Sequence, residues 1–251
     1  MSLLILQLLL LLIATQIAYA FDGQIRPYTV YLGPATLAEM KVSMLSQKDG
    51  TQSVNVAVES RGFGAIFGDF KSTLEILRLA DGSRVLNGSS SWDDTLSQIT
   101  VNWMPGVPAP IVDLYRSEPL DYEITIVNPK SIVNTVDPFL PVFEIGLSLD
   151  HSKRCEGDYR IYDGIRRYDL SIVDGGDREL LDEAFSGVTH RCIITLKRLG
   201  GFSTERGLFK FEESKITRTL YFGKIRDHWI PVRFEIESPL GMAVARLTQG
   251  Q

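Results

Sequence analysis

The segment Asp137-Pro-Phe-Leu-Pro-Val-Phe-Glu-Ile-Gly-Leu-Ser148 departs from the two-residue alternation found elsewhere in the chain. Asp137 is a favourable helix N-cap, and Pro138 is a favourable first helical residue. The segment that follows is polar only at Glu144 and Ser148. A short helix that is apolar on every side must be buried on every side, so we expect a buried helix here. A buried strand is the alternative, because periodicity does not separate the two. The residues that we place in the interior are Phe139, Leu140, Phe143 and Ile145.

Most of the remaining chain alternates between apolar and polar residues, which indicates strands with one buried face. Strands of this kind suit an antiparallel sheet with one side exposed to water. The sequence therefore predicts a mainly β fold, a curled antiparallel sheet or an open barrel-like one, wrapped around the one short helix. The clearest alternating runs are residues 38–44, 54–58, 73–76, 99–103 and 230–236.

Short sequences that combine Asp, Asn and Gly separate these runs and indicate turns. Asn87-Gly88-Ser89 also fits an N-glycosylation acceptor, but we favour the turn. Residues 104–119 contain four prolines and are expected to form a long surface loop, because proline removes a donor from a strand ladder. The predicted turns lie at residues 48–50, 81–82, 87–88, 163–164 and 174–176.

Residues 1–20 have the pattern of a cleavable signal peptide. An apolar run of about eleven residues precedes Ala18-Tyr19-Ala20, a small-x-small pattern of the kind that signal peptidase accepts. The run is short for a membrane span, although a retained anchor is the alternative. Cleavage would leave residues 21–251 as a single β-rich domain in the periplasm, with no further transmembrane segment.

The two cysteines of the chain are Cys155 and Cys192. An even number of cysteines in an exported protein predicts a disulfide bond between them. Two buried free thiols are the alternative.

The formal net charge of the chain is −5. Nucleic-acid binding needs clustered positive charge, so we expect no nucleic-acid partner. The same mild acidity argues against strong attraction to an anionic membrane surface.

No motif of the sequence predicts a metal site, a cofactor or a catalytic residue. His151, His190 and His228 do not share a metal-ligand spacing. The segment Gly62–Gly68 resembles a dinucleotide-binding fingerprint, but its spacing is off by one and no helix pattern follows. We interpret it as an apolar turn between two strands.

The densest polar cluster, residues 155–170, is predicted to form a hairpin with Asp163-Gly164 as its turn. In that register Arg160 pairs with Arg167, Asp158 with Asp169, and Tyr159 with Tyr168. The arginine pair could contact an anion, and the aspartate pair could serve acid–base chemistry. A solvated charge ladder that keeps the hairpin soluble is the alternative.

Several blocks of the sequence resemble one family of exported proteins. The most specific block is Cys155-x-Gly-x-Tyr-Arg-Ile-Tyr-Asp-Gly-x-Arg-Arg-Tyr-Asp-Leu170, which Cys192 follows; the others are residues 28–32, 136–138 and 230–241. Together they resemble domain of unknown function 3108, a family of uncharacterised proteobacterial proteins, and in particular its alphaproteobacterial branch. The resemblance implies a periplasmic protein with no assigned reaction, similar in architecture to sheets that wrap a helix in lipoprotein carriers. The chain departs from the family over residues 174–187, where the acidic run Asp177–Ala184 is expected to form a short helix.

Three functions are compatible with these features. The first is a non-enzymatic periplasmic protein that binds an apolar or lipid-like ligand in the curled sheet, or supports the cell envelope. The second is an envelope scaffold without ligand, which recruits a protein partner through edge strands or the 104–119 loop. The least supported is a hydrolase that uses Asp158, Asp169 or Glu144, the last of which would have to line a cavity.

Overall fold

The computed structural model describes residues 22–120, 122–203, 205 and 211–248. The predicted signal peptide, residues 1–20, lies outside this part of the chain. Among the described residues, no helix has the length and apolar character needed to cross a membrane.

Thirteen strands of the described chain form one sheet in which every neighbouring pair is antiparallel. The order is β7-β6-β5-β4-β3-β2-β1-β13-β12-β11-β10-β9-β8, so β7 and β8 are its edges. The strands are β1 Arg26–Leu32, β2 Ala35–Ser46, β3 Gln52–Ser60, β4 Phe70–Arg78, β5 Arg84–Trp92, β6 Thr95–Trp103, β7 Ile111–Arg116, β8 Gly157–Tyr162, β9 Arg167–Leu181, β10 Ser186–Gly200, β11 Thr217–Ile225, β12 His228–Ser238 and β13 Gly241–Leu247.

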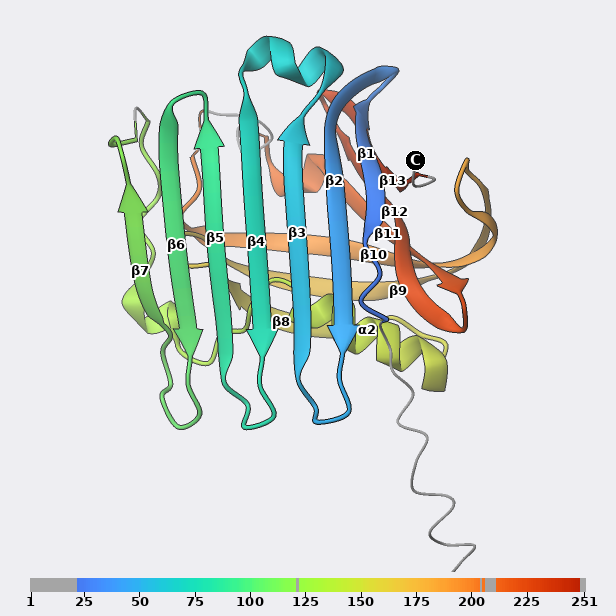
Figure 1. Ribbon diagram of the computed structural model, residues 1–251, viewed down its shortest axis with the longest axis horizontal. Helices are drawn as coiled ribbons and strands as arrows, with labels where there is room; N and C mark the ends of the chain where they lie inside the picture. The colour runs from blue at the N-terminus through green and yellow to red at the C-terminus, as the bar shows by residue number, and fades with distance from the viewer. Residues whose placement is uncertain (1–21, 121, 204, 206–210, 249–251) are drawn as a thin grey trace, which may run out of the picture.

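The sheet curls back on itself. In Figure 1, β2–β7 stand side by side at the front, and β9 and β10 cross behind them. The helix α2, Leu140–His151, lies at the lower end between the two parts, and the short 3₁₀ helix η1, Gly62–Phe67, lies at the upper end. Two further 3₁₀ helices are η2, Pro129–Ile132, and η4, Glu213–Lys215. The predicted mainly β, curled antiparallel fold with one short helix is confirmed.

The helix is buried on one side only. Phe143 and Ile145 are fully enclosed, whereas Phe139 and Leu140 are half-buried. Glu144 is exposed, as are Asp150 and His151 towards the end of the helix. The alternative of a buried strand is therefore wrong, and so is burial on every side, because the helix closes the edge of the curl instead of filling its centre.

The predicted strand faces are confirmed. On β2, Val42 and Met44 point into the core, and they meet Val54 of β3 and Ile76 of β4 there. A second cluster surrounds the far end of α2, where Leu149 packs with Ile172, Leu220 and Phe222. The alternation of each strand thus places its apolar side towards the helix and its polar side towards water.

Four local predictions are wrong. Asn87 and Gly88 lie inside β5 and do not form a turn, and residues 111–116 of the predicted loop form the edge strand β7, whose flanking prolines lie outside it. Residues 174–176 lie within β9 as a bulge opposite Arg191, with Gly176 at a φ of +69°. The predicted helix over 177–184 is instead the end of β9 followed by the hairpin turn.

Candidate ligand-binding cavity

A cavity of about 300 Å³ lies between α2 and the concave side of the sheet. Met40, Val42 and Val56 line it from the front strands, and Leu170, Ile194 and Leu220 line it from the strands behind. Val142 and Ile145 close it from the helix. These side chains are apolar, so the cavity favours an apolar occupant, and its volume is at the low end for ligand pockets.

A buried ion pair fixes the start of the helix against the front strands. Asp137 is completely buried, and its two carboxylate oxygens accept hydrogen bonds from Arg78 Nη2 at 3.0 Å and Nε at 3.2 Å. The same carboxylate accepts from the backbone N–H of Phe139 at 3.0 Å and of Leu140 at 2.9 Å. Helix α2 begins at Leu140 with Phe139 as its N-cap residue, so the predicted N-cap at Asp137 and first helical residue at Pro138 lie two residues too early. Asp137 instead caps the turn that leads into the helix, and the ion pair adds a tertiary anchor to that turn.

Further contacts hold the same segment. The Arg78 guanidinium lies over the Phe143 ring, 4.7 Å from its centroid, and Arg84 Nη1 lies 3.9 Å from the Asp137 carboxylate. Val136 forms a parallel bridge to Ile161, which ties the residues before the helix to β8. The wall that α2 contributes to the cavity is thus held by charge, by aromatic contact and by the backbone.

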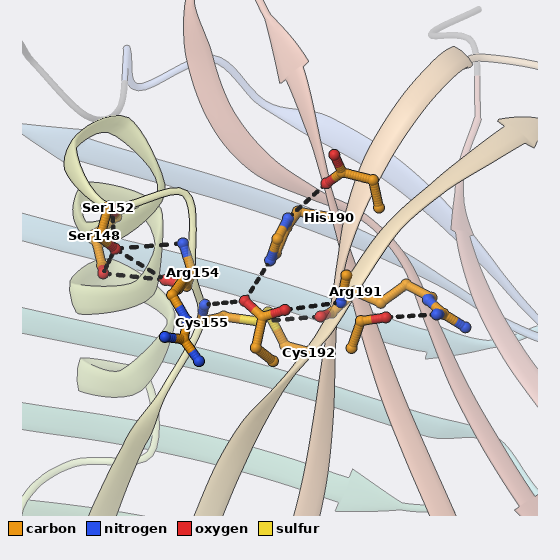
Figure 2. The surroundings of a disulfide bond; sticks show 11 residues. Ser148, Ser152, Arg154, Cys155, His190, Arg191 and Cys192 are labelled. Atoms are coloured by element: carbon orange, nitrogen blue, oxygen red, sulfur yellow. Dashed lines mark hydrogen bonds and ion pairs between the residues drawn. A yellow bond between two sulfur atoms is a disulfide. The ribbon is translucent and has the colours of Figure 1, made fainter.

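The disulfide lies near the other end of the helix, as Figure 2 shows. Cys155 and Cys192 are bonded, as predicted, with their Cα atoms 5.7 Å apart, and both are fully buried. The bond joins the segment after α2 to β10. Ser148 Oγ donates to the carbonyl oxygen of Arg154 at 3.1 Å, so the helix end and the cysteine segment are linked as well.

A histidine between two aspartates accompanies the disulfide. His190 Nε2 lies 2.8 Å from Asp174 Oδ2, and Nδ1 lies 2.7 Å from Asp177 Oδ1. Both nitrogens can donate only when the ring is doubly protonated. Burial alone would raise the pKa of Asp174, but hydrogen bonds from His190 and from the backbone N–H groups of Gly176 and Cys155 hold it below the ordinary value.

This cluster is the best metal-ligand arrangement in the described part of the chain. One potential ligand atom each from Cys155, Asp174 and His190 lies within 4.8 Å of the others. In the oxidised protein the Cys155 sulfur is bonded to Cys192 and is not a thiolate, and both nitrogens of His190 already face carboxylates. The arrangement is therefore suited to stabilising the β9 bulge.

Arg233 is the charged residue of the cavity wall, and its Nη1 and Nε atoms are paired with carboxylates. Nη1 donates to both carboxylate oxygens of Asp182, at 2.8 and 3.0 Å, and Nε donates to Glu235 Oε1 at 2.7 Å. Tyr28, which also lines the cavity, donates its hydroxyl to the carbonyl oxygen of Pro231 at 2.6 Å. The wall therefore recognises apolar shape more readily than a charged head group.

The predicted hairpin of residues 158–169 forms in a different register. Tyr162 pairs with Arg167, Arg160 with Asp169, and Tyr159 with Leu170, a shift of two residues from the prediction. The shift arises because Asp163 Oδ1 accepts from the backbone N–H groups of Ile165 and Arg166, which moves the turn one position along the chain.

The shifted register changes the predicted anion site. Arg160 is exposed and Arg167 is buried, and both guanidinium groups donate to the carbonyl oxygen of Ser131, at 3.1 and 2.7 Å. Arg167 also donates to Asp169 at 2.6 Å. The two arginines meet as expected, but around a backbone acceptor of their own chain. Asp158 lies opposite Ser171, so the two aspartates are not paired across the ladder.

Glu144 does not line the cavity; it is exposed on the outer side of the helix. Burial and the neighbouring Glu144 carboxylate raise the pKa of Tyr159. This arrangement does not meet the condition that a hydrolase based on Glu144 would require.

No protein-family model and no curated protein matches the sequence. A solved structure does match: the crystal structure of a β-barrel-like protein of domain of unknown function DUF1849 from Brucella abortus. The TM-score is 0.60 at 12% sequence identity, and the match covers 90% of this chain and 95% of that one. The two proteins share a β-barrel-like fold. At this identity the similarity is one of fold, and it carries no activity with it.

Proposed function

We propose that this protein is an exported, non-enzymatic carrier that binds an apolar or lipid-like molecule in the cavity beside α2. The apolar cavity is the observation that carries the proposal. A scaffold would gain stability from a filled interior, whereas this interior retains space next to a firmly anchored helix. The volume fits one acyl chain or a comparably small apolar molecule better than a whole phospholipid.

The periplasm is the compartment that we propose for this activity. The predicted signal peptide over residues 1–20 and the disulfide between Cys155 and Cys192 support it, since disulfides persist in oxidising compartments. The resemblance to domain of unknown function 3108 is part of the same proposal, because that family consists of exported proteins.

The test is a titration of the purified protein with a fluorescent long-chain fatty acid. Wild-type protein should bind it with saturable, one-to-one stoichiometry. Val142→Trp, which places an indole in the cavity, should abolish binding while the protein stays folded. Val188→Trp is the matched control, because Val188 is 59% exposed and away from the cavity lining. Absence of saturable binding to wild type, or equal binding to both variants, refutes the proposal.

An envelope scaffold is the second candidate, and the edge strand β7 favours it. Ile111 and Tyr115 of this strand are 54% and 55% exposed, and its outer edge pairs with no strand of the described sheet. Such an edge can accept a strand from another protein. Replacing Val112 by proline would block that edge; loss of a crosslinked partner in cells, with fatty-acid binding retained, would support the scaffold function.

A further inference from the structure

The short helix η1 projects from the end of the sheet opposite α2 (Figure 1), and it carries exposed apolar side chains. Phe63, Ile66 and Phe67 of η1 are 47%, 74% and 62% exposed, and Trp92 at the end of β5 is 51% exposed. The Phe63 and Phe67 rings pack edge to face at 5.2 Å. We call these four residues the aromatic patch. Isolated exposed apolar side chains are common, but four in one place indicate an interaction site.

The patch is one continuous surface formed by two connections. A Cβ atom on Gly68, which follows η1, would lie 2.6 Å from the Trp92 indole nitrogen, so the indole packs directly on the backbone there. Trp92 also contacts Phe70, with ring centroids 5.7 Å apart. The residues of η1 and of the β5 end therefore form a single strip.

The backbone holds the patch out rigidly. A Cβ atom on Gly64 would lie 1.9 Å from the carbonyl oxygen of Leu37, so only glycine allows η1 to pack this closely on β2. The backbone N–H of Arg61 donates to the same carbonyl at 2.9 Å, and that of Gly64 donates to Arg61 at 2.9 Å. These contacts keep the apolar side chains exposed to water. Because they are not buried, they contribute no hydrophobic stabilisation to the fold of the isolated protein.

The two basic residues near the patch, Arg61 and Lys71, are paired with carboxylates, and the acidic Asp93 and Asp94 that follow Trp92 are exposed. Arg61 forms ion pairs with Glu39 and Glu59, and Lys71 lies 2.8 Å from Asp69. Among the described residues around η1, both basic side chains are thus already in ion pairs, and the whole chain carries a net charge of −5. An anionic partner would therefore find no unpaired basic residue there. A partner that is apolar and without net charge fits this surface.

We infer that the aromatic patch docks on the surface of a zwitterionic lipid bilayer, with its side chains inserted at the boundary between head groups and acyl chains. Aromatic rings with a polar edge, such as the Trp92 indole, favour that boundary. At about 200 Å² for each side chain, the exposures leave on the order of 450 Å² of apolar surface. The 3₁₀ helix η1 buries none of its six residues, so its apolar side chains are free to enter the boundary between head groups and acyl chains; a protein partner or a second copy is the alternative that the experiment below separates.

This inference goes beyond ligand binding and holds whether or not the cavity carries a ligand. Its physical connection to the cavity is β2, which contributes Met40 to the cavity wall and the Leu37 carbonyl to the support of η1. Three residues of a strand span roughly 10 Å. The nearest residue of the cavity wall, Met40, therefore lies roughly 10 Å along β2 from the support of η1, whereas α2 closes the cavity towards the other end of the sheet.

The experiment is sedimentation of the full protein with phosphatidylcholine vesicles, with and without added phosphatidylglycerol. We expect binding to both, with no gain from the anionic lipid and little dependence on salt. Phe67→Ser should weaken binding at least tenfold, whereas Leu79→Ser, 45% exposed at the other end of β4, should leave it unchanged. Bromine-labelled acyl chains should quench the Trp92 fluorescence, and Trp92→Phe should remove that response while binding persists.

Several results would overturn the inference. These are no binding to phosphatidylcholine, binding only to anionic vesicles at low salt, equal binding by Phe67→Ser, or a dimer in solution that Phe67→Ser dissociates. Unchanged melting temperatures of the variants would exclude misfolding as the cause. Val142→Trp separates the two proposals, because it should lose fatty-acid binding and keep vesicle binding.

Discussion

Replacing Asp137 by Asn tests how the helix is held in the curl of the sheet. The asparagine side chain keeps the shape and can still accept from the backbone N–H groups of Phe139 and Leu140, so this local capping of the turn before the helix is largely retained. The change removes one negative charge that lies 3.0 Å from Arg78, a residue that is itself only 7% exposed. The experiment therefore isolates the ion pair from the cap.

The expected loss follows from the burial of both partners. Leaving a buried guanidinium without its counter-charge destabilises a protein by about 3–5 kcal/mol. Arg84, at 3.9 Å from the same carboxylate, adds a second positive charge to that environment. For a domain of this size the loss corresponds to a decrease of about 6–20 °C in melting temperature.

Urea unfolding and thermal melting measure this effect, with Asp69→Asn as the control. Asp69 lies 2.8 Å from Lys71, but its side chain is 63% exposed, so its loss should change the unfolding free energy by no more than about 1 kcal/mol. Arg78→Met combined with Asp137→Asn should destabilise less than the sum of the single changes. If Asp137→Asn stays within about 1 kcal/mol of wild type, or if the double change is additive, the reasoning about this ion pair is wrong.

Three further changes test the rest of the framework. Cys155→Ala with Cys192→Ala opens a loop of 37 positions and should lower the unfolding free energy by about 4 kcal/mol in a urea titration without reductant; an unchanged midpoint would contradict this. Since the pKa of Asp174 in the folded protein lies below its ordinary value of 3.8, the ionised carboxylate stabilises the fold fully above that value, and the contribution is lost as the pH falls through the lowered pKa. Asp174→Asn should therefore be less stable than wild type at neutral pH, with a difference that shrinks below about pH 4 in unfolding curves; a constant difference would argue against the linkage. Gly201→Ala should destabilise by at least about 2 kcal/mol more than Gly106→Ala, since both residues have positive φ but only at Gly201 would the Cβ meet a carbonyl oxygen, at 2.0 Å.

The sequence was sufficient to predict the faces of the strands. Alternation has a period of two, so it assigns each side chain to a face whatever strand lies alongside. The hairpin after Gly157 illustrates this, because its register differs from the prediction by two residues. A shift of two returns every side chain to the same face of the sheet. Tyr159 and Ile161 therefore lie on the predicted face, although each pairs with a different residue of β9 than predicted.

The predicted turns at residues 48–50, 81–82 and 163–164 are present, whereas those at 87–88 and 174–176 are not, because a local turn signal does not say whether the chain reverses. Gly88 lies in the middle of β5, where a Cβ would approach Ile99 to 2.9 Å, so the glycine provides room for a neighbour across the ladder. Residues 174–176 use the same freedom to form a bulge within a long strand. In both places the requirement for glycine comes from tertiary structure.

The candidate site depended on contacts that the sequence does not encode locally. Arg78 and Asp137 lie 59 positions apart, and only the curl of the sheet brings them together. The same is true of His190 and its two aspartates, which meet because the bulge shortens one side of the hairpin. The apolar character of the interior was readable beforehand, whereas the unfilled space depends on how side chains from many strands meet α2.

The place of β13 in the sheet has a consequence for how the protein is made. Residues 241–247 of β13 pair with β1 on one side and with β12 on the other. They thus join strands β1–β7, which are synthesised first, to strands β8–β12, which are synthesised later. Neither half can complete its hydrogen bonding at this boundary until the latest-made strand of the sheet is available. A chain emerging from a ribosome or a translocation pore can pair β1 with β2 early, but the other edge of β1 stays unpaired until almost the whole chain has passed through, which makes shielding of that edge from aggregation a requirement of its biogenesis.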